Sequence, residues 1–112
     1  MLTKEKLNEF GANTESGIKR CANNEALYLR LVGTIPSNNS FNNLYEAIKR
    51  NDLAEAFSNA HGLKGILANL SLDSLLVPVT IITEHLRNKD MIDYSTMINN
   101  IEQKRKELEA LL

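Results

Sequence analysis

The sequence predicts an all-α protein, and three observations lead to this prediction. The chain of 112 residues contains only two prolines and five glycines, so few positions break a helix. Between these breaks the apolar residues recur mostly at spacings of three and four, the period of a helix with one buried face. Tryptophan is absent and only 5% of residues are aromatic, so aliphatic side chains must build the core, as is typical of helix-on-helix packing. A chain of this length holds one modest core, and we therefore expect a single domain over residues 1–112.

The N-terminal part of the chain predicts short helices. A first helix is expected over residues 3–10, and Gly11 would end it. A second is expected to begin at Thr14 as its N-cap and is weakened by Gly17.

The next part of the chain carries two apolar stripes with a polar turn between them at residues 37–40. The first stripe stops at Pro36, which cannot continue a helix interior. Two helices, or one helix broken at the turn, fit this pattern. The apolar positions of the two stripes are Leu27, Tyr28, Leu31 and Ile35, then Phe41, Leu44, Tyr45 and Ile48.

The segment over about residues 53–70 predicts the most informative helix of the chain. Asp52 followed three residues later by Glu55 resembles a capping box with Asp in place of Ser or Thr, so a helix should start there. Apolar residues spaced by three and four give it a continuous buried stripe: Phe57, Ala60, Leu63, Leu67 and Leu70.

Two further helices complete the predicted fold. One follows Asp73 as its cap, with Pro78 near its first turn or slightly kinking it, and the last covers about residues 93–111. Long amphipathic helices joined by short turns suggest an antiparallel four-helix bundle with one or two short additional N-terminal helices.

Charge and cysteine content exclude several classes of protein. Thirteen Lys and Arg residues against 14 Asp and Glu give a net charge of −1, without the basic excess on which nucleic-acid binding depends. The single Cys21 has no partner for a disulfide or a thiolate metal site, and we interpret it as a small core residue. The first residues, 1–6, lack the apolar stretch typical of a secretory signal peptide, and no apolar run approaches the ~20 residues that span a bilayer. We expect a cytoplasmic monomer that binds neither nucleic acid nor a membrane.

The residues best suited to carry out a reaction lie on the predicted helix over residues 53–70. His61, Lys64, Gly65 and Ala68 occupy positions i, i+3, i+4 and i+7, which places them within one quadrant that borders the buried stripe. We therefore expect His61 to be exposed, with a cation one turn along and small side chains around it. Gly65 and Gly62 each cost about 1 kcal/mol relative to Ala in a helix interior, and close approach by another surface would explain both.

These residue types suit the carriage of a phosphoryl group. A neutral imidazole has a free lone pair near neutral pH, so His61 can attack phosphorus and later act as the leaving group. An ammonium group nearby stabilises the negative charge on the transferring oxygens, which is the role expected of Lys64. The small Gly65 and Ala68 would leave the path to His61 clear for a partner.

The motif His61-Gly62-Leu63-Lys64-Gly65 resembles the H-x-L-K-G signature of histidine-containing phosphotransfer (HPt) domains. The family's usual small and leucine positions also follow at Ala68 and Leu70, and segments 25–28 and 50–52 resemble the family more weakly. The resemblance implies a four-helix bundle that exchanges phosphate with the aspartate of response-regulator receiver domains, and hybrid histidine kinases as further partners.

The resemblance also assigns roles to single residues. It makes His61 the phosphorylated residue, Lys64 the cation that faces the phosphate, and Gly65 the small residue that admits the receiver, with Gly62 and Ala68 on the same partner-binding surface. The chain departs from the family's usual residues at Gly62, Ile66 and Ser71, which bears on partner preference more than on activity.

The sequence shows no nucleotide-binding loop and no metal-ligand cluster, so we expect a phosphocarrier without kinase activity and without a cofactor, Mg²⁺ belonging to the receiver. Two other functions remain open: a non-catalytic bundle that regulates receivers or kinases by binding them, and the phosphoacceptor module of a chemotaxis-type kinase.

Single residues also have simpler interpretations. His61 could be an ordinary surface histidine and Lys64 a solvated charge, while Gly65 could permit close helix packing. His85, near Glu84 and Arg87 at a helix end, is expected to be solvated or to interact with the helix dipole.

Overall fold

The computed structural model describes residues 1–112 and contains helices and the turns between them, with no strand. The predicted all-α class is therefore confirmed. The helices in chain order are α1 (Lys4–Phe10), α2 (Thr14–Arg20), α3 (Glu25–Gly33), α4 (Asn39–Lys49), α5 (Leu53–Asn69), α6 (Asp73–Arg87) and α7 (Ser95–Glu109).

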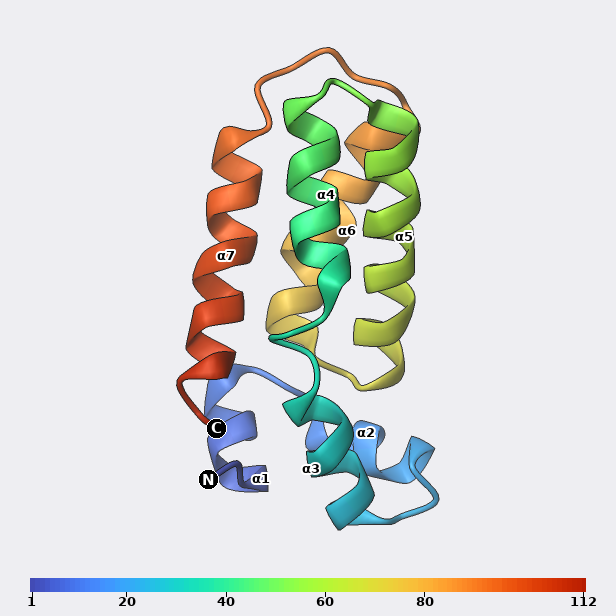
Figure 1. Cartoon of the computed structure of the whole chain (residues 1–112). Helices are drawn as coiled ribbons and strands as arrows, with labels where there is room; N and C mark the ends of the chain where they lie inside the picture. The colour runs from blue at the N-terminus through green and yellow to red at the C-terminus, as the bar shows by residue number, and fades with distance from the viewer.

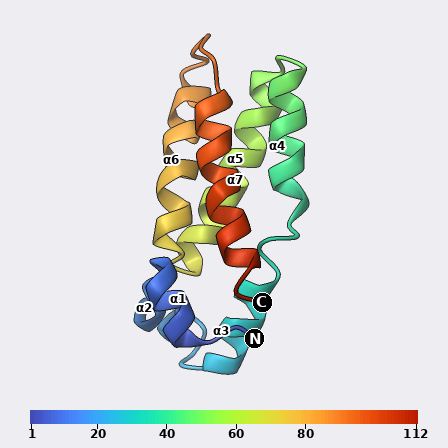
Figure 2. The same cartoon turned by 90° about the vertical axis from the view of Figure 1, so that its left-hand side faces the viewer.

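The four longest helices, α4 to α7, lie alongside one another, and the three short helices α1 to α3 gather at one end of them (Figure 1). The view turned by 90° shows the same grouping (Figure 2). The molecule is accordingly elongated, with extents of 41 × 24 × 19 Å. Three short helices precede the long ones, rather than the one or two that the sequence suggested, because the segments before and after Pro36 form separate helices, α3 and α4.

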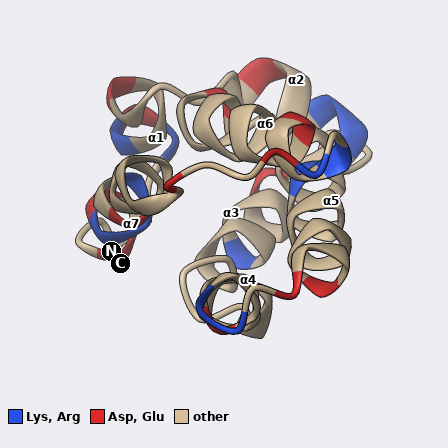
Figure 3. Ribbon diagram, turned by 90° about the horizontal axis from the view of Figure 1, so that it is seen from above, with Lys and Arg blue, Asp and Glu red and all other residues tan.

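Helix α5 packs between α4 and α6, and α6 also packs against α7. Seen along the long helices, α4 and α6 lie on either side of α5 (Figure 3). Positive and negative residues are intermixed on the helices in this view, as the balanced composition leads one to expect. No helix of the chain combines the length and the apolar character that crossing a membrane requires.

Side-chain caps begin several helices where the sequence predicts them. The Asp52 carboxylate accepts a hydrogen bond from the Glu55 amide at 3.1 Å, which confirms the predicted start of α5. Thr3 caps α1 through its hydroxyl, and Gly11 ends that helix with a left-handed φ of 108°.

Two cap predictions were wrong. Asn13 caps α2 by accepting from the Ser16 amide, because the buried Thr14 hydroxyl instead donates to Asn8 Oδ1 at 2.7 Å. Asp73 is the first residue of α6 and makes no capping hydrogen bond.

Pro78 decides between two alternatives for α6, and the start of α7 differs from the sequence prediction. Helix α6 continues through Pro78, which lies inside the helix, so a place in the first turn is wrong and a slight kink stays a prediction. Helix α7 begins at Ser95, whose amide donates to the Asp93 carboxylate at 2.9 Å, and hydrogen bonding to Ser95 lowers the pKa of Asp93.

The core stripe of α5 is nearly as predicted. Ala60, Leu63, Leu67 and Leu70 are buried, whereas Phe57 is only half-buried and Ala56 occupies the buried position next to it. Phe57 lies at the edge of the stripe, so its ring reaches the surface of the helix.

The C-terminal end of α5 is attached to the short helices through Tyr28. The Tyr28 hydroxyl, which is buried, donates to the Leu70 carbonyl at 2.8 Å. Its ring lies against α2 so closely that a Cβ at Gly17 would stand 2.3 Å from Tyr28 Cε1. Gly17, which weakens α2 by propensity, is therefore required for the contact between α2 and α3. Arg20 of α2 also donates to the carbonyl of Ala68.

Candidate functional site

The residues singled out by the sequence lie together on the exposed side of α5. His61, Gly62 and Gly65 are exposed, Lys64 and Ala68 are half-buried, and Lys64 lies at the contact with α6. A regular helix over Leu53–Asn69 produces this arrangement, because it brings positions three, four and seven residues apart onto one side.

The imidazole of His61 stacks on a neighbouring aromatic ring. The rings of His61 and Phe57 have centroids 5.5 Å apart and an interplanar angle of 20°. Phe57 precedes His61 by one helical turn and restricts the orientation of the imidazole. Apolar spacing predicted a core position for Phe57, and this role was not predicted, although the spacing of four from His61 was a usable signal.

Lys64 does not stand alone as a free cation. Its Nζ lies 3.6 Å from Oε1 of Glu84 on α6, and the other oxygen of the same carboxylate accepts from Arg87 Nε at 3.1 Å. The guanidinium of Arg87 in turn lies over the ring of Phe57, 4.9 Å from its centroid. Two cations and one carboxylate from two helices are thereby linked to the residues on either side of His61 along α5, Phe57 and Lys64.

The two glycines beside His61 have no structural neighbour that would exclude a side chain. A Cβ built at Gly62 or Gly65 meets no heavy atom within 4 Å. Close helix packing, one interpretation of Gly65 left open by the sequence, therefore does not explain this residue. The contrast with Gly17, whose Cβ position is filled by Tyr28, shows that α5 does not need either glycine in order to pack.

Exposed apolar residues also lie on α6, where Val77 and Ile81 line a hollow shared with α7. Val77 and Ile81 are 58% and 48% exposed, and they precede Glu84 by seven and three residues on the same side of the helix. Large apolar side chains exposed next to one another are a common feature of protein-binding surfaces.

The second histidine belongs to a different arrangement. His85 Nδ1 lies 2.7 Å from the Asp90 carboxylate, near the C-terminal end of α6. This partner was not predicted from the sequence, because Asp90 lies beyond the helix in the turn that follows. No group of three His, Cys, Asp or Glu side chains is placed to hold a metal ion.

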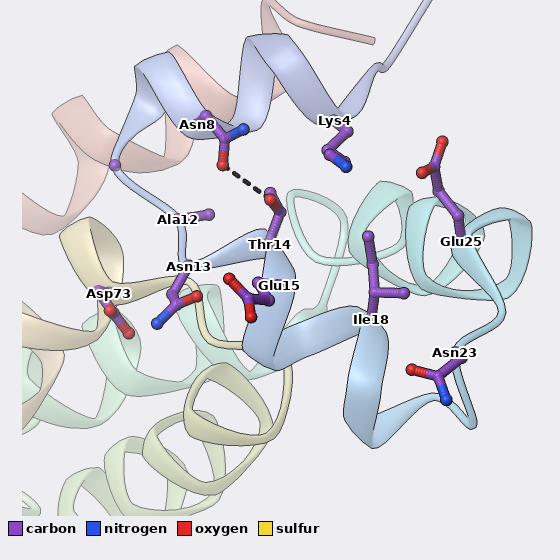
Figure 4. A pocket seen from close by; sticks show the side chains of 11 residues that line it. Lys4, Asn8, Ala12, Asn13, Thr14, Glu15, Ile18, Asn23, Glu25 and Asp73 are labelled. Atoms are coloured by element: carbon purple, nitrogen blue, oxygen red, sulfur yellow. Dashed lines mark hydrogen bonds between the residues drawn. The ribbon is translucent and has the colours of Figure 1, made fainter.

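A cavity of about 780 Å³ lies among the short helices and not beside His61 (Figure 4). Its lining is mainly polar and includes Lys4, Glu15, Glu25 and Asp73. Two of the residues that line it are joined by a hydrogen bond, which the Thr14 hydroxyl donates to Asn8 Oδ1. The cavity shares no residue with the cluster around His61.

Comparisons of the chain with models of protein families, with curated proteins and with solved structures found no match.

Proposed function

We propose that this protein is a phosphorelay intermediate that carries a phosphoryl group on His61 and exchanges it with the aspartate of response-regulator receiver domains. One observation carries the proposal: an exposed imidazole lies one helical turn from Lys64 and beside two glycines whose Cβ positions are empty. The proposal includes the assignment of α4 to α7 to an antiparallel four-helix bundle of the HPt type, with hybrid histidine kinases as upstream partners.

The proposed chemistry needs few groups on this chain. The lone pair of an imidazole nitrogen forms the N–P bond while the P–O bond to the receiver aspartate breaks, and the carboxylate leaves with the electron pair. The reverse step returns the phosphoryl group. Lys64 stabilises the negative charge on the transferring oxygens, and the receiver supplies Mg²⁺ and the acid–base groups.

The surface around His61 also suits a protein partner. The glycines allow a partner backbone or side chain to approach the imidazole, and Val77 and Ile81 supply apolar area on the neighbouring helix. We propose that a receiver covers both. The free Cys21 is compatible with the cytoplasmic location that belongs to this proposal, since thiols stay reduced there.

Phosphotransfer profiling tests the proposal directly. The protein is incubated with phosphorylated receivers of the source organism, and with their hybrid kinases and ATP. We expect acid-labile, alkali-stable label on the wild type and none on His61→Gln. Lys64→Ala should slow transfer or shorten the lifetime of the phosphohistidine while the helical content stays unchanged.

The matched control is His85→Gln, which removes the other histidine and should leave the label in place. Label that persists in His61→Gln would contradict the assignment. Saturable binding of receivers without any phosphate exchange would instead favour a non-catalytic regulator. The phosphoacceptor module of a chemotaxis-type kinase shares the chemistry, and transfer from a kinase domain but from no receiver would favour that alternative.

A further inference from the structure

The carboxylate of Glu84 holds two cations beside the proposed phosphoacceptor. Oε1 lies 3.6 Å from Lys64 Nζ and Oε2 accepts from Arg87 Nε at 3.1 Å, so each oxygen serves a different cation. The first contact joins α6 to α5, and the second lies within α6. Both cations are thereby occupied while His61 carries no phosphoryl group.

The two cations lie on opposite sides of His61 along α5. Lys64 follows His61 by three residues, whereas Arg87 contacts Phe57, which precedes His61 by four. Helices α5 and α6 run in opposite directions here, because residue 57 meets residue 87 and residue 64 meets residue 84. Along α5, Lys64 therefore lies one turn beyond His61, and Arg87 lies over the ring of Phe57, which is one turn before His61 and stacks on the imidazole.

The existing pairs are of a kind that exchanges easily. The side chains of Lys64 and Glu84 are 34% and 49% exposed, and ion pairs this open to water are weak. A phosphoryl group offers three oxygen acceptors and close to two negative charges near neutral pH, against two oxygens and one charge for a carboxylate. Arg87 adds a planar fork of donors that matches phosphate oxygens.

We propose that Glu84 competes with the phosphoryl group for Lys64 and Arg87, and that both cations pass from Glu84 to the phosphohistidine when His61 is phosphorylated. Arg87 is thereby a second phosphate-binding cation, and Glu84 a positioning residue that restrains both cations in the unphosphorylated protein. The proposal rests on the function proposed above, since it requires His61 to accept a phosphoryl group.

The test uses phosphoramidate, a small donor that needs no partner protein. In this reaction the N–P bond to His61 forms as the P–N bond of the donor breaks, and ammonia leaves. We expect Glu84→Gln, which removes the competing charge, to increase the labelling rate of His61 about two- to fivefold, the range that an exposed ion pair supports. Arg87→Gln should lower the rate by a similar factor, and Arg87→Lys should lie between Arg87→Gln and the wild type.

The matched control is Glu107→Gln. Glu107 is similarly exposed and pairs with Lys104 three residues away on α7, far along the chain from His61. The Glu107→Gln substitution removes the same charge from the same kind of ion pair, and it should leave the labelling rate of His61 unchanged. Circular dichroism of each variant checks that the helices persist.

A coupling measurement separates competition for the two cations from a general effect of charge. In a Lys64→Ala/Arg87→Gln background, Glu84→Gln should have no further effect on the labelling rate. An equal acceleration in that background, an equal effect of Glu107→Gln, or an unchanged or slower rate in Glu84→Gln would overturn the proposal.

Failure of this inference can be told from failure of the proposed function. If no receiver exchanges phosphate with His61 but Glu84→Gln accelerates phosphoramidate labelling as described, the relay function is wrong and the competition stands. If receivers do exchange phosphate and Glu84→Gln changes nothing, only the competition is wrong.

Discussion

At the scale of single residues, His61 depends on neighbours of two different origins. Phe57 and Lys64 lie on the same helix, and their spacing from His61 could be derived from helical geometry alone. Glu84 and Arg87 lie on α6, and their position next to Lys64 and Phe57 depends on which helices pack together and in which register. The half of the site that lies on α5 was therefore predictable from the sequence, and the half on α6 was not.

Gly65 gives a prediction that separates folding from partner access. Gly65→Ala should raise the free energy of unfolding by about 1 kcal/mol, because alanine is the better helix former and the Cβ position is empty. Gly65→Gln should fold as well as the wild type and accept label from phosphoramidate. It should transfer the label to a receiver at least tenfold more slowly than the wild type, which corresponds to a transfer barrier about 1.4 kcal/mol higher. Urea unfolding and single-turnover transfer measure the two effects.

The control for this variant is Asn69→Gln, which alters another exposed position of α5 two turns beyond His61. It should transfer at the wild-type rate. Transfer by Gly65→Gln at that same rate would show that Gly65 does not admit the partner.

At the scale of helices, local signals explain what could and could not be predicted. The start of α5 was predicted because Asp52 is the residue that caps it, and its carboxylate accepts from the Glu55 amide in the structure. The start of α2 was misplaced by one residue because Asn13 and Thr14 are both good capping residues, and only the position of Asn8 decides between them. Phe57 was assigned to the core because apolar periodicity cannot distinguish a residue at the centre of the buried face from one at its edge.

Gly17 and Gly65 provide a pair of identical substitutions with opposite expected signs. Gly17→Ala should lower the free energy of unfolding by roughly 1–3 kcal/mol, because the new methyl group would collide with the buried ring of Tyr28. Gly65→Ala, which meets nothing, is the matched control. Thermal and urea unfolding of both variants measure the difference, and a stabilised Gly17→Ala would contradict the contact between α2 and α3.

At the scale of the whole molecule, two tyrosines hold segments that are far apart in the chain. Tyr28 bonds Leu70, and the Tyr45 hydroxyl donates to the Glu102 carboxylate at 2.6 Å, joining α4 to α7. Burial raises the pKa of Tyr28 to about 12, and burial with the hydrogen bond to Glu102 raises the pKa of Tyr45 well above its usual range. The spacing of apolar residues reports only on neighbours within one helix. The all-α class could therefore be predicted from it, whereas these long-range hydrogen bonds could not.

The raised tyrosine pKa values predict a loss of stability in alkali. A group whose pKa is higher in the folded state contributes stability below its unfolded pKa of about 10 and loses it as the pH rises toward the folded value. Between about pH 9 and pH 11, Tyr28→Phe should therefore lose about 1 kcal/mol less unfolding free energy than the wild type. Urea unfolding at both pH values measures this difference. Equal losses in the two proteins would show that the Tyr28 hydroxyl does not titrate differently on folding.

The two empty Cβ positions beside His61 also bear on how α5 moves. Glycine widens the range of backbone conformations, so the middle of α5 should open more readily than the turns on either side, without the whole molecule unfolding. In native-state hydrogen exchange, we expect the amides around residues 62–66 to exchange faster than those of the well-packed turn around Ala56. Gly62→Ala and Gly65→Ala together should slow that exchange. A helix with uniform protection along its length would show that the glycines do not loosen this segment.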